Sequence, residues 1–303
     1  MTFSLTILGS SSAIPTLTRN PSAHLLNVNE RFFLIDCAEG TQLQIRRFHV
    51  HLQRIQRIFI SHLHGDHYYG LIGLINTLHL LGRKDELHLY GPPVLKDIID
   101  IQLRASQTTL NYPLVFYPLS FSGYNLIFED DKVTVHSFPL IHSVPTCGFI
   151  FRQKNQGRKL RKDKVNELSI PIAAMHDLKE GQDYIDEQGR VFKNDDITMD
   201  PPAPKSYAYC SDTAYDEEIL PIIRNCDLLY HEATFMQKMV ASAQDKRHST
   251  TIEAATLAKK AMVKKLLIGH FSARYDDLQP LLDEARTIFP DTILAEDGMS
   301  FPI

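Results

Sequence analysis

Three histidines and one aspartate lie within the six residues "HLHGDH" of this 303-residue chain. Imidazole and carboxylate groups are metal ligands, and such a cluster adds nothing to the packing of a hydrophobic core. His62 and His64 are two residues apart, so in an extended segment their side chains point the same way and can bind one ion. Gly65 permits a sharp turn that brings Asp66 and His67 to a second position.

The ligand types indicate which metal this cluster binds. Imidazole and carboxylate ligands without a thiolate are typical of zinc, with manganese or iron as possible substitutes. A site that leaves coordination positions to water is catalytic, whereas a structural zinc site is usually enclosed and rich in cysteine. The alternative is a chance run of surface histidines in a chain that contains 14 of them. The position of the motif between an expected strand and an expected helix favours the metal site.

Further ligands are expected at the ends of other strands. His142 in "LIHSVPT", Asp212 in "YCSDT" and His270 in "LIGHF" each follow an apolar run that reads as a strand. Asp212 could bridge two ions, because a carboxylate has two oxygens. His136 lies in the middle of an expected strand, which favours a packed or hydrogen-bonded histidine over a ligand.

The elements that position these residues are many short strands with helices between them. The strands are expected at residues 3–8, 31–36, 57–61, 86–91, 114–119, 132–138, 148–153, 206–212, 227–233, 265–271 and 292–298, and the helices at 40–48, 68–81, 93–104, 250–262 and 276–288. The strands are rich in β-branched and aromatic residues, and Gly, Pro, Asn or Asp separate them. This order predicts an α/β fold in which two sheets form a sandwich with helices outside.

Composition and cysteine usage limit the class of protein. A hydrophobic content of 44% and a net charge of −4 are those of an ordinary globular protein. From the length of the chain we expect one large domain with one inserted segment. The N-terminus lacks a basic leader, and no apolar run approaches the length of a membrane span. The four cysteines, Cys37, Cys147, Cys210 and Cys226, have no CxxC spacing, which favours reduced thiols and a cytoplasmic protein.

One segment, Arg152 to Lys205, does not show the pattern of alternating strands and helices. It is polar and ends in the proline-rich stretch "DPPAPK", so it is either a disordered surface loop or a protruding arm. Its first part, Arg152 to Lys164, carries seven basic residues and a single acid, Asp163. The basic residues are Arg152, Lys154, Arg158, Lys159, Arg161, Lys162 and Lys164. In an acidic chain, this concentration favours contacts with a phosphate backbone over ordinary solvated surface.

The motif "SHLHGDH", followed in order by His142, Asp212 and His270, resembles the HxHxDH pattern of the metallo-β-lactamase superfamily. The resemblance implies an αβ/βα sandwich with two zinc ions in a cleft between the sheets. It assigns three histidines to one ion, two histidines and an aspartate to the other, and Asp212 to both. The first set is His62, His64 and His142, and the second is Asp66, His67 and His270. Asp36 in "LIDCAEG" is implied as a residue that supports the ligands.

Further motifs resemble the ribonuclease Z family of tRNA 3′-processing endonucleases, in its short form. They are "HEAT" at His231 to Thr234, "RHST" at Arg247 to Thr250, "GHFSARY", "LGSSSAIPT" and "DCAEGTQ", which together span nearly the whole chain. The resemblance implies one domain over residues 1–303 with an inserted arm at 152–205. It also implies that the arm is an exosite for precursor tRNA and that the protein is a homodimer. In one departure from the bacterial arms, "IPIAAMHDLKEG" lacks a Gly-Pro pair before the LKxG stretch.

The resemblance also implies roles in the hydrolysis of a phosphodiester. A metal-bound hydroxide would attack the phosphorus and leave a 3′-hydroxyl on the tRNA. Asp66, Glu232 and His248 are implied as catalytic residues, the last two as candidates to stabilise the transition state and to protonate the leaving oxygen. Without the resemblance, a salt-bridged glutamate and a helix-capping histidine would be equally good interpretations. The residues expected to bind substrate are Arg158, Lys159, Arg161, Lys162 and Arg274.

Two other functions are compatible with parts of the pattern. A phosphodiesterase or arylsulfatase of the same fold that acts on small esters would not need the basic stretch between Arg152 and Lys164. A catalytically silent RNA-binding subunit would be expected to have lost ligands, yet every expected ligand position is occupied. Both observations favour the endonuclease.

Overall fold

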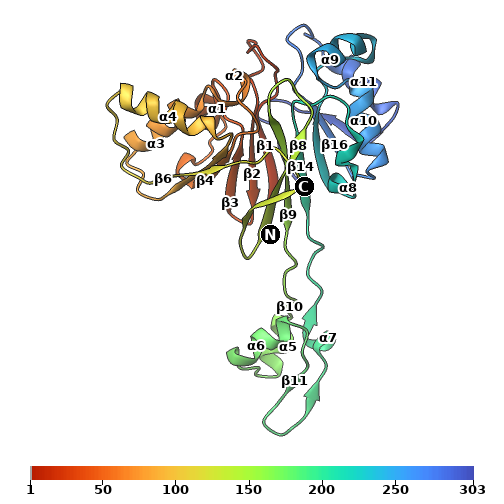
Figure 1. Ribbon diagram of the computed structural model, residues 1–303. Helices are drawn as coiled ribbons and strands as arrows, with labels where there is room; N and C mark the ends of the chain where they lie inside the picture. Colours follow the sequence, from red (N-terminus) through yellow and green to blue (C-terminus); the bar gives the residue numbers. More distant parts are fainter. Residues whose placement is uncertain (1) are drawn as a thin grey trace. The chain divides into compact units, whose positions relative to one another are not determined.

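The computed structural model describes residues 2–303, which divide into two compact units. Unit 1 comprises the chain up to Arg152 and from Lys205 onward, and unit 2 comprises Gln153–Pro204. Unit 1 contains two seven-stranded sheets that face each other, with helices on the outer side of each (Figure 1). The predicted α/β sandwich with helices outside is therefore confirmed.

The first sheet has the strand order β18-β1-β2-β3-β4-β5-β6. Its strands are β1 (Phe3–Gly9), β2 (Ala23–Val28), β3 (Arg31–Ile35), β4 (Ile55–Phe59), β5 (Leu87–Gly91), β6 (Leu114–Pro118) and β18 (Ser300–Pro302). The pairs from β18 to β3 are antiparallel, and the pairs from β3 to β6 are parallel. The parallel part places the ends of β3 and β4 at the same edge, where Asp36 follows β3 and the first expected metal ligands follow β4.

The second sheet has the order β17-β16-β15-β14-β9-β8-β7. Its strands are β7 (Asn125–Glu129), β8 (Val133–Leu140), β9 (Thr146–Gln153), β14 (Ser206–Cys210), β15 (Leu228–Glu232), β16 (Leu266–Gly269) and β17 (Thr292–Leu294). β14, β15, β16 and β17 are parallel neighbours. The carboxyl ends of β14, β15 and β16 therefore also meet at one edge.

The helices of unit 1 flank the sheets in two groups (Figure 1). The first group is α1 (Thr41–Arg47), α2 (Gly65–Tyr68), α3 (Leu71–Leu80) and α4 (Val94–Ala105), and the second is α8 (Leu220–Ile223), α9 (Val240–Lys246), α10 (Thr251–Lys260) and α11 (Gln279–Arg286). Short 3-10 turns lie at Leu52–Arg54, Glu217–Ile219 and Gln237–Met239. α10 begins with a capping box, in which Thr250 and Glu253 bind each other's backbone N–H groups.

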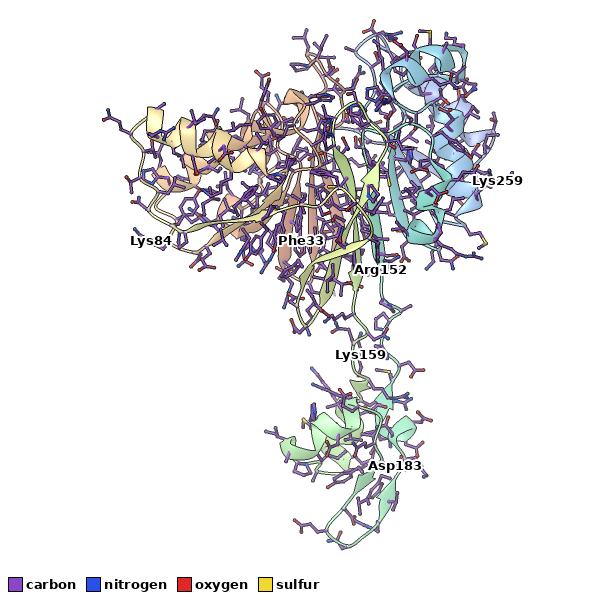
Figure 2. The ribbon with its side chains drawn as sticks, viewed as in Figure 1. Phe33, Lys84, Arg152, Lys159, Asp183 and Lys259 are labelled. Atoms are coloured by element: carbon purple, nitrogen blue, oxygen red, sulfur yellow. The ribbon has the colours of Figure 1, made fainter. Side chains whose placement is uncertain are left out.

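Alternation along the strands builds three apolar layers. Successive side chains of a strand point to opposite faces. On β3, Phe33 lies between the sheets (Figure 2), whereas Leu34 packs against the helices of the first group. On β9, Phe149 and Phe151 likewise fill the space between the sheets, whereas Ile150 faces the helices of the second group. Both sheets are thus covered on both faces, which leaves their edges for the functional groups.

The expected helix at residues 68–81 is interrupted at Gly70. A Cβ atom at Gly70 would lie 2.0 Å from the carbonyl oxygen of Ala38, so only glycine permits this approach. The backbone N–H of Gly70 donates to the carbonyl of Cys37, whose own N–H donates to the carbonyl of His67. The break between α2 and α3 therefore fixes His67 beside the segment that follows β3.

Unit 2 has its own small core, formed by Ile170, Leu178 and Ile197. Its elements are β10 (Lys159–Leu160), α5 (Lys162–Glu167), a 3-10 turn at Ile172–Ala174, α6 (Met175–Lys179), β11 (Tyr184–Ile185), β12 (Val191–Phe192), α7 (Asn194–Ile197) and β13 (Thr198–Met199). The buried Asn194 side chain donates to the carbonyls of Leu178 and Gln182. The segment from 152 to 205 therefore contains an ordered unit of secondary structure.

Two further sequence observations concern the whole chain. All four cysteines are free and buried, as expected for reduced thiols. Among residues 2–303, no helix has the length and apolar character needed to cross a membrane.

Candidate metal centre

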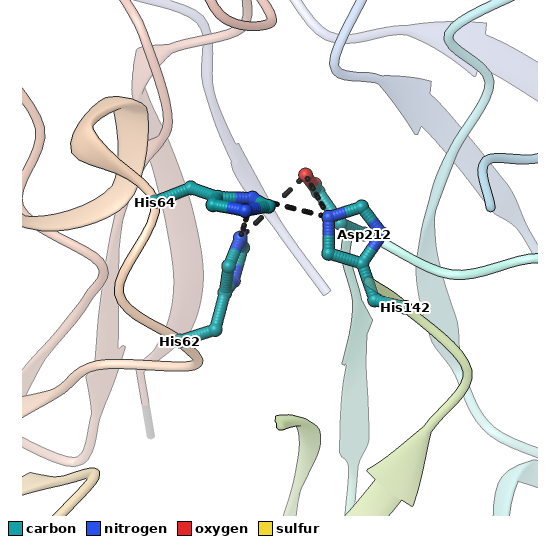
Figure 3. A group of neighbouring side chains, drawn as sticks. All are labelled: His62, His64, His142 and Asp212. Carbon is teal, nitrogen blue, oxygen red and sulfur yellow. Dashed lines mark hydrogen bonds and ion pairs between the residues drawn. The ribbon is translucent and has the colours of Figure 1, made fainter. Parts of the chain in front are cut away.

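The side chains expected to bind metal come from strand ends of both sheets. His62 and His64 follow β4 of the first sheet, and His142, Asp212 and His270 follow β8, β14 and β16 of the second. Figure 3 shows two histidines from one side converging on a histidine and an aspartate from the other. The structure thus brings together residues that are far apart in the sequence.

Three imidazole nitrogens meet at the first position. Nδ1 of His64 lies 3.2 Å from Nε2 of His62 and 3.1 Å from Nε2 of His142. Oδ2 of Asp212 lies 3.7 Å from Nε2 of His62 and 3.6 Å from Nε2 of His142. The four ligand atoms all lie within 4.8 Å of one another. This is the set that the resemblance to the metallo-β-lactamase superfamily implies for the first ion.

The second position uses the other oxygen of the same aspartate. Oδ1 of Asp212 lies 3.3 Å from Nε2 of His67 and 3.1 Å from Nε2 of His270. Oδ2 of Asp66 lies 3.7 Å and 3.4 Å from the same two nitrogens and accepts a hydrogen bond from the backbone N–H of Ala13. Asp212 therefore faces both positions, one oxygen to each, which is the geometry of a bridging ligand.

The electrostatics of the cluster fit a divalent cation. Burial, with His67 as the next cause, lowers the pKa of His62 well below its usual value, so this imidazole is neutral and offers a lone pair. Burial also opposes a charge on His67, but the carboxylates of Asp212, Asp36 and Asp66 outweigh it and raise the pKa of His67 well above its usual value. Nε2 of His67 is buried, and no hydrogen bond within residues 2–303 engages it. The raised pKa keeps a proton on this imidazole, and a bound cation would displace that proton from Nε2 and neutralise the surplus negative charge around it.

Asp36, which follows β3 and is fully buried, holds the ligand segment in place. Its carboxylate accepts hydrogen bonds from the backbone N–H of Ser61 at 2.8 Å and from the Ser61 hydroxyl at 2.9 Å. It also accepts from Nδ1 of His67 and from the Tyr209 hydroxyl, each at 2.7 Å. Asp36 has a left-handed backbone (φ 56°), a conformation that aspartate tolerates better than most residues. Its supporting position is the one that the resemblance implied.

Four of the five histidines have a partner on Nδ1 that turns Nε2 toward the centre of the cluster. Such partners fix the tautomer and orientation of a ligand imidazole. The pairs are His62 with Ser61 Oγ (3.0 Å), His67 with Asp36 (2.7 Å), His142 with the Arg247 carbonyl (3.0 Å) and His270 with Thr234 Oγ1 (2.9 Å). His64 differs, because its Nδ1 itself faces the first position.

Glu232 and His248 form a pair beside the second position. Nδ1 of His248 lies 2.7 Å from Oε1 of the fully buried Glu232. Burial disfavours the charged imidazole, yet the Glu232 carboxylate outweighs it and raises the pKa of His248 to about 9. The Thr234 hydroxyl donates to Oε2 of Glu232 at 2.7 Å and so joins this pair to His270. The arrangement can hold a proton on His248 close to the metal ligands.

A cleft of about 770 Å³ opens over the cluster. Ser12, Tyr69, Lys246 and His248 are among the residues that line it, together with ligands from both positions. A cleft of this size and mixed polarity accommodates a nucleotide-sized group.

The residues expected to bind substrate lie elsewhere. Arg274 packs its guanidinium over the Phe235 ring, 5.0 Å from the centroid, and donates to the Ser272 hydroxyl. Lys159, Arg161 and Lys162 are exposed on unit 2, where no ion pair within residues 2–303 engages them (Lys159 is labelled in Figure 2). Arg158, by contrast, has internal partners. It pairs with Asp195 and Asp200 at 2.6 Å each and donates to Thr198.

No direct signal in the sequence indicates the partners that orient the side chains of the cluster. Ser61, Tyr209 and Thr234 act through hydroxyls, and Arg247 acts through a backbone carbonyl, so none has the appearance of a ligand. Ser61 lies beside His62 in "SHLHGDH", and Thr234 lies two residues after Glu232 in "HEAT". This closeness to a functional residue is the only feature of the sequence that points to them.

Comparisons with known proteins give the family. The chain is 42% identical to ribonuclease Z of Parabacteroides distasonis over 301 residues, which are 99% of each chain. It is 44% identical to ribonuclease Z of Cytophaga hutchinsonii over 302 residues, which cover 99% of this chain and 96% of the relative. Residues 3–148 also match the family model described as anti-Pycsar protein Apyc1.

Solved structures agree. The structure of human tRNase Z, short form, superimposes with a TM-score of 0.73 at 28% identity and covers 99% of both chains. The metallo-β-lactamase fold protein YhfI from Bacillus subtilis superimposes with a TM-score of 0.69 over 99% of both chains, and at 17% identity it shows the fold alone. With relatives above 40% identity over practically its whole length and this site in the same fold, the chain belongs to the ribonuclease Z family and has the metallo-β-lactamase fold.

Proposed function

We propose that this protein is an endoribonuclease that removes the 3′ trailer from precursor tRNA and leaves a 3′-hydroxyl on the tRNA. The observation that carries the proposal is the full-length similarity to ribonuclease Z, combined with seven side chains of ligand type that converge at one cleft, five of which line it. A small-ester phosphodiesterase or arylsulfatase is not favoured, since the relatives described above are named ribonuclease Z. Cleavage of an end-labelled precursor tRNA by the purified protein tests the proposal.

We propose two zinc ions as the metals of this site. Zinc is favoured because the ligands are imidazoles and carboxylates without thiolates, and two ions because Asp212 presents one oxygen to each position. When bound, the metal would supply Lewis acidity, which acidifies water and neutralises charge on a phosphate oxygen. His62, His64 and His142 would hold one ion, Asp66, His67 and His270 the other, and Asp212 both.

The protein's own groups would handle the leaving oxygen. His248 lines the cleft and has its Nδ1 bound to Glu232, so Nε2 is the nitrogen left to carry a proton toward a substrate. Glu232 receives further hydrogen bonds from the backbone N–H groups of Thr213 and Thr234, which hold its carboxylate still. Asp66 is proposed to combine metal binding with orientation of the attacking water. Arg274, which is exposed and lies four residues after His270, remains a candidate phosphate contact.

Unit 2 is proposed as an exosite for the body of the tRNA. Lys159, Arg161 and Lys162 provide exposed cations within four residues, and the ion pairs of Arg158 stabilise the segment that carries them. Arg158 itself would then contribute mainly to the folding of unit 2, with its charge partly neutralised by two aspartates. The remaining cations would contact phosphates without reading sequence.

A homodimer is proposed as the functional assembly, and a cytoplasmic location stays a prediction. Tyr69, Val94 and Ile101 are large exposed apolar residues on or next to α3 and α4. A shallow groove of about 60 Å³ between these helices is lined mainly by apolar side chains, Ile72 and Leu95 among them. Contiguous exposed apolar surface of this kind marks an interface between proteins.

The bridging role of Asp212 can be tested by metal content. Elemental analysis should find about two zinc ions per chain in the purified protein, because the ligands exceed what one tetrahedral site uses. Asp212→Ala should deplete both ions, whereas Asp245→Ala, which removes an exposed acid of the same cleft, should retain both. Full activity with one ion per chain, or full occupancy in Asp212→Ala, would contradict the dinuclear site.

Substitution of the proposed proton donor should slow cleavage without loss of metal. His248→Ala and Glu232→Gln are expected to reduce the rate on precursor tRNA by roughly a hundred- to ten-thousandfold. A chromogenic phosphodiester with a good leaving group needs less protonation, so its hydrolysis should fall less. His51→Ala, at an exposed histidine, serves as the control. Equal losses on both substrates would indicate that the pair supports the metal or the fold.

Neutralising the exposed cations of unit 2 should weaken tRNA binding. In Lys159→Gln/Arg161→Gln/Lys162→Gln, each lost phosphate contact should flatten the dependence of log affinity on log salt by about one unit or less. Hydrolysis of the chromogenic diester should be unchanged, since so small a substrate makes none of these contacts. The control is Arg190→Gln/Lys193→Gln, which removes two cations that are already paired with Asp186 and Asp183. Wild-type cleavage and salt dependence in the triple variant would refute the exosite.

A charge placed on the apolar surface of α4 should dissociate the dimer. Light scattering of the wild-type protein should give about twice the mass of one chain. Ile101→Glu should give the mass of one chain, because burial of an unpaired carboxylate in the interface is unfavourable. Leu126→Glu changes an equally exposed apolar residue on β7 and should leave the dimer intact. A monomeric wild-type protein at micromolar concentration would rule out the proposed assembly.

A further inference from the structure

Arg247 occupies a backbone position that usually belongs to glycine. It ends helix α9 with φ 55° and ψ 49°, the left-handed conformation of a helix C-terminus. Its N–H donates to the carbonyl of Gln244, and the N–H of His248 donates to the carbonyl of Ala243, which completes the cap. A residue with a Cβ atom is strained in this conformation, whereas glycine is not. Other non-glycine residues of the chain have the same conformation, among them Gln107 and Met262, so a role for the Arg247 side chain has to come from its contacts.

The side chain and the backbone of Arg247 both bind His142. The Arg247 carbonyl lies 3.0 Å from Nδ1 of His142, and the Arg247 guanidinium donates through Nη1 to the His142 carbonyl at 2.7 Å. A carbonyl can only accept, so Nδ1 of His142 must carry the proton of the first bond. Nε2 then carries the lone pair, and this nitrogen faces His64 and Asp212. The two bonds run in opposite directions and form a reciprocal clamp.

The clamp also fixes the proposed proton donor. His248 is the next residue in the chain, and its ring centroid lies 5.0 Å from that of His142. One ring follows strand β8, whereas the other belongs to the turn between α9 and α10, two segments far apart in sequence. The reciprocal bonds of Arg247 therefore connect the segment of a metal ligand to the segment of the proton donor.

We propose that Arg247 is a positioning residue: the bond from its guanidinium to the His142 carbonyl keeps the Arg247 carbonyl against Nδ1 of His142, which favours the ligating tautomer, and sets the distance between His142 and His248. The cleavage part of this proposal rests on the proposed function, whereas the metal-binding part does not. Two other roles make different predictions. A purely structural role in capping α9 would be better served by glycine, and a direct phosphate contact would leave metal binding untouched.

Arg247→Gly tests the clamp, because glycine keeps the left-handed cap and the backbone carbonyl and removes only the guanidinium bond. Zinc-loaded protein is mixed with a chromogenic chelator, and the rate of zinc release is measured. Loss of a partner that orients a ligand typically costs about ten- to a hundredfold in metal affinity or activity, so one of the two ions should be released faster by that factor. The thermal midpoint of the metal-free variant should equal or exceed that of the wild type.

Two further variants and a second readout complete the experiment. Arg247→Lys retains a donor that can reach the His142 carbonyl and should restore part of the slow release. Lys246→Ala removes the neighbouring cation of the same cleft and should behave as wild type in zinc release. On precursor tRNA, Arg247→Gly should lower kcat more than it raises KM.

Three results would overturn the proposal. Zinc release from Arg247→Gly at the wild-type rate would show that the clamp does not hold the ligand. A raised KM with unchanged kcat and unchanged release would assign Arg247 to the substrate. A lowered thermal midpoint of metal-free Arg247→Gly would assign it to the fold. A wild-type protein that binds zinc but does not cleave precursor tRNA would refute the proposed function, while the release rates would still test the clamp.

Discussion

The buried carboxylate of Asp36, which accepts hydrogen bonds from residues of both sheets, is the interaction on which the rest of the site depends. Asp36 has no exposure to water, and an ionised buried carboxylate is costly by several kcal/mol unless hydrogen bonds replace its hydration. Ser61 and His67 come from the segment after β4 of the first sheet, whereas Tyr209 comes from β14 of the second. The four donors are in place together only when the sheets are packed against each other. The orientation of His67, an expected metal ligand, therefore depends on correct packing of the two sheets.

Hydrogen bonds also orient the other histidines of the cluster. Thr234 accepts from Nδ1 of His270 and donates to Glu232, which in turn binds His248. A hydroxyl can do both because it is donor and acceptor at once, which an ionised carboxylate or an ammonium group at this position could not be. A continuous chain of hydrogen bonds thus connects the second metal position to the group proposed to carry the proton. A shift of one of these hydrogen-bonded side chains would therefore change the positions of the others.

The sequence predicts which side chains converge in the cluster but not the hydrogen bonds that orient them, for physical reasons. His62, His64, Asp66 and His67 lie within six residues, and the more distant members of the cluster could be located because strand ends meet at a sheet edge. The Arg247 carbonyl that binds His142 is a backbone group, so no residue type signals it. Strands β2, β7 and β18 were not predicted. The expected helix at 68–81 is broken at Gly70 between α2 and α3, because the contact of Gly70 with Ala38 is a tertiary one. In unit 2 the strands have two residues each, too few to show a period.

A run of basic residues in a sequence also does not show which of its cations are free to bind a polyanion, because some of them have partners within the protein. The stretch from Arg152 to Lys164 reads as one basic run, but the structure gives its cations different surroundings. Arg152 donates to the Tyr124 hydroxyl and the Ile222 carbonyl within unit 1, and Arg158 and Lys164 pair with acids of unit 2. Such pairs leave little net field beyond a Debye length. Within residues 2–303, Lys159, Arg161 and Lys162 are exposed and have no ion pair, so if unit 2 binds a polyanion as proposed, these three cations are the ones free to contact it.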